Sequence, residues 1–315
     1  MEFIEIILTI IPLVIAISLG YLLTKSGFLK ANYIDAFKKI VVNITLPAGL
    51  LVAFSSIQFK VKYIIIFAAV FVTCYILLLI GKLIAGIFKV KSPYFPYLLT
   101  GFEAGMMGYA LYGGLYGMDK ISEFGIIDIG QVTFVFLILV PAVLSIGKEK
   151  SDESRVIASL KTAVNSPVIW AIIIGLLLSV AGIYQYENTT LFKGLLNIFN
   201  FLSAPTSLLI CFIIGSGLKL SVKGMKKEVM TAFLKVLMAF IFALLLKVTL
   251  LRILGVEAML SRALVSMFIL PAPFVIPVFM SRQNESDINY VSNTLSIGTI
   301  VGLLLFILLA LLNFQ

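Results

Sequence analysis

Apolar stretches long enough to cross a bilayer recur ten times along this chain of 315 residues, and no other feature constrains the fold as much. A membrane-spanning helix needs about 20 predominantly apolar residues. The chain is also 61% hydrophobic and only 12% charged, whereas soluble domains are about 25% charged. We therefore expect an all-α integral membrane protein. Its ten transmembrane spans are expected at residues 3–24, 37–56, 63–88, 94–117, 122–147, 163–184, 190–218, 228–252, 258–281 and 288–312.

The net charge of +9 is explained by membrane orientation and does not indicate a nucleic-acid partner, because the basic residues lie in short loops between the spans. With the N-terminus outside the cytoplasm, the inside loops hold 16 Lys and Arg residues and the outside loops hold 7. Basic residues accumulate in cytoplasmic loops. We therefore expect a multi-pass protein of the plasma (inner) membrane, in contact with the lipid bilayer, with both termini outside the cytoplasm.

The ends and the reactive side chains of the chain indicate no processing and no catalysis. Glu2 and Glu5 precede the first span and no basic residue comes before Lys25, so a cleaved signal peptide is not expected. Cys74 and Cys211 lie within apolar spans, without metal-binding or disulfide spacing. The sequence offers no nucleophile–base pair, metal cluster or phosphate loop. We expect no enzyme activity, no metal and no cofactor.

The chain contains an internal repeat. The stretch "IPLVIAISLGYLLTKSG" (11–27) aligns with "SPVIWAIIIGLLLSVAG" (166–182), at an offset of 155 residues. One span later, "LPAGLL" (46–51) aligns with "APTSLL" (204–209), at an offset of 158. Five spans per repeat is an odd number, so the second copy must enter the membrane from the opposite side.

The repeat predicts the domain organisation. The first five-helix repeat covers residues 1–147, a cytoplasmic linker covers 148–162, and the inverted second repeat covers 163–315. Inverted repeats are the usual architecture of secondary transporters, with the substrate near the midplane between discontinuous helices. The alternative is a duplicated membrane scaffold without transport activity.

The fourth span of each repeat carries helix-breaking residues. In 258–281 these are Pro271, Pro273 and Pro277, each of which costs about 3 kcal/mol inside a helix. Irregular backbone at membrane depth occurs only where protein or water satisfies it, so both spans are expected to break and to form the site. Close helix packing through GxxxG pairs is the alternative for the glycines. Span 94–117 has six glycines, namely Gly101, Gly105, Gly108, Gly113, Gly114 and Gly117.

A few ionisable side chains fall inside spans, where they are functional candidates by default. Glu103 lies about ten residues into the fourth span, and Asp128 begins the group Asp128, Gln131 and Thr133 in the fifth. Glu103, Asp128 and Gln131 are candidates for ion coupling. A structural hydrogen bond is the alternative for Glu103, and solvation near the interface is the alternative for Asp128. Lys235 and Lys247 are interpreted as scaffold residues that snorkel to the interface.

Four stretches, taken in order, resemble the auxin efflux carrier family, which includes bacterial malonate and malate carriers and plant PIN auxin exporters. They are "VNITLPAGLL" with Asn43 and Pro47, "SPVIWAIIIGLLL", "SAPTSLL" and "SNTLSIGT". The resemblance implies that helices 4 and 9 break and cross at the midplane. It also implies a scaffold domain from helices 1, 2, 6 and 7, a transport domain from helices 3–5 and 8–10, organic anions as substrates, and an elevator mechanism.

The expected substrate site combines this resemblance with the interrupted spans. Half-helix N-termini suit a carboxylate and half-helix C-termini suit a cation, while Asn43 and Thr206 or Ser207 offer hydrogen bonds from the scaffold side. Ala110 stands where the family commonly has proline, and Glu103–Ala104 where it commonly has asparagine. The expected substrate-binding residues are Asn43, Pro47, Glu103, Gly105, Gly108, Tyr109, Ala110, Thr206, Pro271, Pro273, Phe274 and Pro277.

Coupling and assembly are left open by the sequence. Because the chain has no histidine, a proton relay must use Glu103 or Asp128, and sodium coordination by the same carboxylates is equally permissible. The rival interpretations are a membrane-embedded ligand sensor with the same pocket and a sodium-coupled organic-anion symporter of the bile-acid type. A channel is disfavoured, because the interruptions do not resemble a continuous polar pore. A homodimer is a possible assembly.

Overall fold

The computed structural model describes residues 3–55, 61–116, 120–146, 167–183, 189–217, 224–255, 258–281 and 284–311, and every regular element in these ranges is a helix. The expected linker 148–162 and Gly117 lie outside the described residues. Shorter apolar helices lie at Ile15–Lys25 and Ala258–Phe268. Five helices are long and apolar enough to cross a membrane: Lys62–Ile87, Glu123–Ser145, Thr190–Gly217, Lys226–Leu250 and Glu285–Leu309.

The chain divides into two compact units, and each is described by itself. Unit 1 contains Met1–Val14, Ile64–Glu149 and Gly217–Gln315, and unit 2 contains Ile15–Tyr63 and Lys150–Ser216. Both units are therefore assembled from segments of the first and the second half of the sequence.

Unit 2 is built from short helices that pack through glycine. Its elements are the C-terminal part of α1 (Phe3–Lys25), from Ile15 onward, then α2 (Ala31–Ile40), η1 (Val41–Thr45), α3 (Leu46–Ser55), α10 (Pro167–Val180), α11 (Thr190–Ser203) and α12 (Thr206–Gly217). The element η1 is a single π-helical turn that joins α2 to α3, and α3 packs against α10 and α11.

One glycine–phenylalanine contact occurs twice in unit 2. A Cβ atom on Gly20 of α1 would lie 2.7 Å from Phe212 Cα of α12, and a Cβ on Gly175 of α10 would lie 2.7 Å from Phe54 Cβ of α3. Gly20 and Gly175 are paired by the 155-residue offset, and Phe54 and Phe212 by the 158-residue offset. Residues that the repeat relates thus make matching contacts, each relying on the missing glycine side chain.

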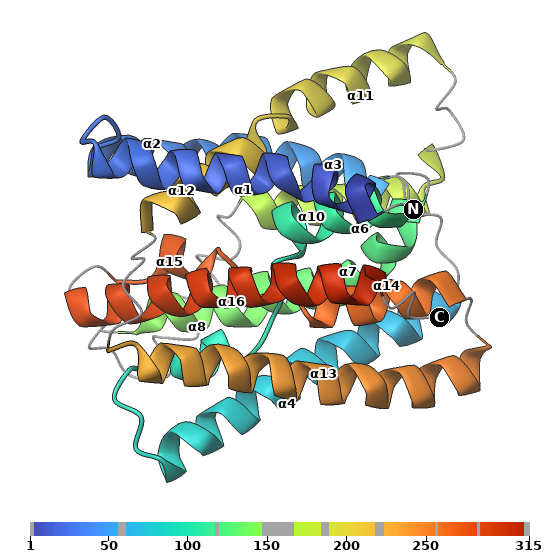
Figure 1. Cartoon of the computed structure of the whole chain (residues 1–315). Helices are drawn as coiled ribbons and strands as arrows, with labels where there is room; N and C mark the ends of the chain where they lie inside the picture. Colours follow the sequence, from blue (N-terminus) through green and yellow to red (C-terminus); the bar gives the residue numbers. More distant parts are fainter. Residues whose placement is uncertain are drawn as a thin grey trace. The chain divides into compact units, whose positions relative to one another are not determined.

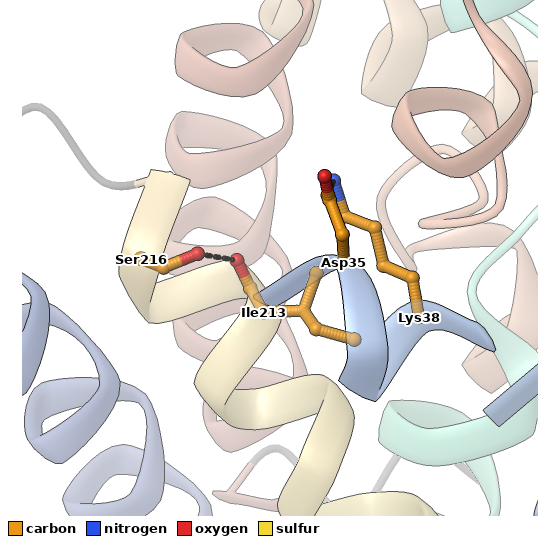
Figure 2. Close-up of polar contacts among 4 residues, drawn as sticks. All are labelled: Asp35, Lys38, Ile213 and Ser216. Carbon is orange, nitrogen blue, oxygen red and sulfur yellow. Dashed lines mark hydrogen bonds and ion pairs between the residues drawn. The ribbon is translucent and has the colours of Figure 1, made fainter. Parts of the chain in front are cut away.

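The paired helices also end alike. Gly27 follows α1 with a φ of +79° and Gly182 follows α10 with a φ of +69°, the left-handed conformation that glycine adopts after a helix C-terminus. In the same unit, α2 lies beside α12, with the Phe37 and Phe212 ring centroids 6.4 Å apart. Figure 2 shows this region, where Lys38 Nζ is 4.0 Å from Asp35 Oδ1 and the Ser216 hydroxyl donates to the Ile213 carbonyl at 2.7 Å.

Unit 1 surrounds two interrupted segments with long helices. Its long helix α13 (Lys226–Leu254) packs along both α14 and α16 (Figure 1). The remaining elements are α4 (Val61–Ile87), α5 (Phe95–Leu98), η2 (Ala104–Gly108), α6 (Tyr109–Tyr116), α7 (Ile121–Phe134), η4 (Val135–Leu139), α8 (Val140–Ser145), α14 (Ala258–Phe268), α15 (Ile276–Phe279) and α16 (Glu285–Leu311).

Candidate functional site

The first interruption lies between α5, which ends at Leu98, and η2, which begins at Ala104. Gly101 is the only glycine within the gap, and its φ of +66° is a left-handed conformation. A Cβ atom at Gly101 would lie 2.7 Å from Cγ of Pro273, so glycine is needed both for the backbone turn and for the approach of the second segment. Gly101 therefore fixes where the fourth expected span unwinds.

The other described glycines of this span have different roles. Gly108 is a packing position, because an added Cβ would lie 2.5 Å from Cζ of Phe124 and 2.8 Å from Cδ1 of Leu270. Gly105 is exposed and is the second residue of the π-helical turn after the gap. The two explanations that the sequence left open, unwinding and close packing, thus apply to different glycines.

The second interruption lies between α14, which ends at Phe268, and α15, which begins at Ile276. Pro271 and Pro273 lie inside the gap, and both are buried. Pro277 is instead the second residue of α15, a position where the missing N–H of proline costs no helical hydrogen bond. Of the three prolines, two therefore interrupt the span and the third starts the next helical turn.

The two interruptions contact each other through Glu103. Its backbone N–H donates to the carbonyl of Pro271 at 2.9 Å, and its Oε2 accepts a hydrogen bond from the backbone N–H of Phe274 at 2.7 Å. The side chain is only 6% exposed. Charge-assisted hydrogen bonds of this kind are about twice as strong as neutral ones. Glu103 thus joins the two broken segments by both its backbone and its carboxylate.

The segment before Glu103 is hydrogen-bonded to three different helices. Thr100 donates its hydroxyl to the Cys74 carbonyl of α4 at 2.6 Å. The Gly101 carbonyl accepts from Lys235 Nζ of α13 at 2.6 Å, and the Phe102 N–H donates to Gln131 Oε1 of α7 at 3.1 Å. Backbone groups freed by unwinding must find partners when buried, and here the side chains of Lys235 and Gln131 supply two of them.

Asp128 binds two side chains that flank the first interruption. Its Oδ1 accepts from Gln131 Nε2 at 2.7 Å, and its Oδ2 accepts from the Tyr109 hydroxyl at 3.1 Å. It is 1% exposed, so the expectation of a buried group is confirmed and solvation near the interface is wrong. Since Gln131 binds Phe102 and Tyr109 begins α6, Asp128 links the backbone on both sides of the first interruption.

The interpretation of Lys235 as a snorkelling scaffold residue is wrong. Its side chain is 3% exposed, its ammonium binds the Gly101 carbonyl, and Nζ lies 3.8 Å from the ring centroid of Phe102. The sequence showed a lysine at depth in an apolar helix, which fits both snorkelling and docking. What the helix packs against decides between them, and that segment lies 134 residues away in the chain.

Comparison with known families decides what kind of protein carries this site. The model of the membrane transport protein family matches residues 5–310, nearly the whole chain. The chain belongs to the membrane transport protein family. Its members are transporters and not enzymes, and the apolar helices agree with a multi-pass membrane protein. No curated protein matches the chain.

Several expected site residues of this membrane transport protein are not in the interrupted region. Asn43 lies in η1 of unit 2, is exposed, and donates to the Lys39 carbonyl one turn earlier at 2.8 Å. Pro47 is half-buried in α3. Thr206 begins α12 and donates to the Ser203 carbonyl at 2.6 Å. Ala110 is the second residue of α6, and its side chain and that of Ser207 lie outside the described ones.

Sequence reasoning also missed the π-helical turns. Three occur in the described chain, as η1 around Asn43, η2 directly after Glu103, and η4 in the fifth expected span. Single π-helical turns are rare in proteins overall, but those that occur are often found at functional sites. A repeating apolar pattern does not reveal them, because one extra residue per turn changes which face a side chain takes without changing composition. Two of the three coincide with expected substrate-binding residues.

Proposed function

We propose that this membrane transport protein is a secondary active transporter of small organic anions, carboxylates such as malonate, malate or auxin-like acids, in the auxin efflux carrier branch of its family. The observation that carries the proposal is the hydrogen bond from the Phe274 N–H to the Glu103 carboxylate. Phe274 lies just before the half-helix α15, and N–H groups at such a position favour anions. The interrupted backbone thus already binds one carboxylate.

The substrate would bind at the same interruption, beside Glu103. Gly105 is exposed, and a Cβ added to it would lie 3.6 Å from Glu103 Oε1, so this glycine brings an exposed stretch of backbone close to the carboxylate. The proposal places the substrate against Gly105 and the N-terminal turns of η2 and α15. The family resemblance of "VNITLPAGLL" and "SAPTSLL" supports including Asn43, Pro47 and Thr206 as contacts from the scaffold.

Access would alternate by an elevator movement in a fold of ten spans, arranged as two inverted repeats. The proposal assigns helices 3–5 and 8–10 of unit 1 to the transport domain. It assigns unit 2, together with the first part of helix 1 (Met1–Val14), to the scaffold domain, with both termini outside the cytoplasm of a plasma (inner) membrane. The matching contacts of Gly20 with Phe212 and of Gly175 with Phe54 support the repeat. The 16 to 7 division of basic residues supports the orientation.

Glu103 is the proposed coupling residue. Protonation would convert its Oε2 from a charged acceptor of the Phe274 N–H into a weaker neutral one. The protonation state of Glu103 would thereby control how tightly the two interrupted segments are joined. We expect Glu103→Gln to fold with an unchanged elution profile and to lose gradient-driven uptake. Asp128→Asn serves as a comparison, because Asp128 contacts Gln131 and Tyr109 and not the second interruption. Full gradient-driven transport by Glu103→Gln would remove this residue from the mechanism.

The proposed function is tested by uptake of radiolabelled organic acids into liposomes that contain the purified protein. Dicarboxylates, monocarboxylates and aromatic acids are compared, with a proton gradient, a sodium gradient or neither. Saturable uptake of at least one acid, abolished by dissipating its driving gradient, is the expected result. Tight binding of an acid without uptake under any gradient would instead identify a membrane-embedded sensor.

A further inference from the structure

The buried ammonium of Lys235 is placed where a broken helix exposes a carbonyl. Lys235 is the tenth of the 29 residues of α13, on the order of 14 Å from the start of that helix at 1.5 Å per residue. A lysine near a helix end can extend along the helix to water. Here the side chain turns inward, is 3% exposed, and ends on Gly101, the residue at which the fourth span unwinds.

The partners of this ammonium are those that a small cation would use. The Gly101 carbonyl lies 2.6 Å away, a short distance even for a charge-assisted hydrogen bond. The Phe102 ring centroid lies 3.8 Å away, well within the distance of about 6 Å at which an aromatic face attracts a cation. Unwound carbonyls at half-helix C-termini are the groups that coordinate sodium in transporters with discontinuous helices. In this chain a side chain occupies such a carbonyl.

We propose that Lys235 is a resident cation of the first interruption, which takes the place of a coupling sodium ion on the Gly101 carbonyl and makes transport independent of sodium. The inference rests on the proposed function, since it concerns how that transport is coupled. The charge stays bound to the protein in every cycle, so it positions the backbone before Glu103 without being released on either side of the membrane. The carboxyl groups of this region are Glu103, one residue after Phe102, and Asp128, which reaches Phe102 through Gln131.

A purely structural role for Lys235 predicts different behaviour from a resident cation. If Lys235 acts only by packing its alkyl chain, Lys235→Met should keep most of the wild-type stability and uptake, because methionine fills a similar volume without charge. If its charge matters, Lys235→Met loses function, while Lys235→Ala leaves a space that an external cation can enter. The missing part of the side chain in Lys235→Ala corresponds to n-propylammonium, which serves as a probe along with sodium.

The first test measures the thermal unfolding midpoint of purified protein in detergent, and it needs no substrate. Sodium chloride, n-propylammonium chloride and choline chloride are compared at equal ionic strength. We expect the midpoint of the wild type to be the same in all three. We expect that of Lys235→Ala to be lower in choline and to rise by several degrees with sodium or n-propylammonium. Lys247→Ala, on the same helix but half-buried, should show no cation response.

The second test measures uptake in liposomes. Wild-type uptake should be unchanged when choline replaces sodium. Uptake by Lys235→Met should be slower by about tenfold or more, because the variant loses a hydrogen bond made by a charged group. The proposal is overturned by a wild type that sodium stabilises or activates. It is equally overturned by a Lys235→Met with wild-type uptake, or by a folded Lys235→Ala that neither cation stabilises. If the wild type transports no acid, the proposed function fails, and the unfolding midpoints still decide whether Lys235 occupies a cation site.

Discussion

Substituting Gly101 by alanine should destabilise the protein more than any other Gly→Ala change at a described glycine of the fourth span. The left-handed backbone, with a φ of +66°, costs a residue with a Cβ about 1–2 kcal/mol. The added Cβ would lie 2.7 Å from Pro273 Cγ and 3.2 Å from Val135 Cγ2, an overpacking that costs about 1–3 kcal/mol. Together these costs lower the free energy of unfolding by roughly 2–5 kcal/mol.

Three other glycines separate the two contributions. Gly27 has a φ of +79° but nothing within 4 Å of an added Cβ, so Gly27→Ala measures the backbone cost alone. Gly108 has no positive φ but would clash with the buried Phe124 ring, so Gly108→Ala measures the packing cost alone. Gly86→Ala, with neither, is the control and should be neutral or slightly stabilising.

The assay is the thermal unfolding midpoint of the purified variants in one detergent, followed by intrinsic fluorescence. We expect the midpoint to fall in the order Gly86→Ala, then Gly27→Ala and Gly108→Ala, then Gly101→Ala, with the last decreased on the order of 10 °C. A Gly101→Ala variant as stable as Gly86→Ala would refute the reasoning, because it would mean that neither the turn nor the Pro273 contact constrains this residue. A fall equal to that of Gly27→Ala alone would show that the Pro273 ring moves away at little cost.

Two further substitutions test the hydrogen bonds behind the interruption. Gln131→Met removes both the acceptor of the buried Phe102 N–H and the donor to Asp128 Oδ1. We expect the free energy of unfolding to drop by at least about 1–3 kcal/mol, read as a lower denaturant midpoint. An unchanged midpoint would show that both groups find other partners. Tyr109→Phe deletes only the hydroxyl that donates to Asp128, and it should cost about 1 kcal/mol by the same measurement. If Tyr109→Phe lowered the free energy of unfolding more than Gln131→Met, the Tyr109–Asp128 hydrogen bond would be the more important of the two, contrary to this expectation.

The interrupted helices could be predicted from the sequence because their cause is local. Proline lacks a backbone N–H wherever it stands, so Pro271 and Pro273 identify the second gap by themselves. Glycine is weaker information, since it permits both unwinding and close packing. Six glycines in the fourth span predicted weakness without showing that Gly101 alone lies in the gap, or that Gly108 is needed against Phe124.

The polar partners of the site could not be predicted, because they depend on which helices become neighbours. Glu103 and Asp128 attract attention as charges inside apolar spans, and both are buried. Their partners are the Pro271 carbonyl, the Phe274 N–H, the Gln131 amide and the Tyr109 hydroxyl. These four residues are among the expected site residues, but the sequence does not show which of them binds which carboxylate. Asn43 shows the reverse case, because a conspicuous polar residue is bound to a carbonyl of its own helical turn.

The paired contacts in unit 2 have a consequence for the origin of the chain. Gly20 receives Phe212, and Gly175 receives Phe54, so each half of the sequence supplies one glycine and one phenylalanine to the other. Two identical chains related by a two-fold axis make such reciprocal contacts, in which the same surface serves on both partners. Under the inverted-repeat arrangement proposed above, a half-length ancestor inserted into the membrane in both directions would have held its two copies together by this exchange. Gene fusion would then have required no new interface, only a linker.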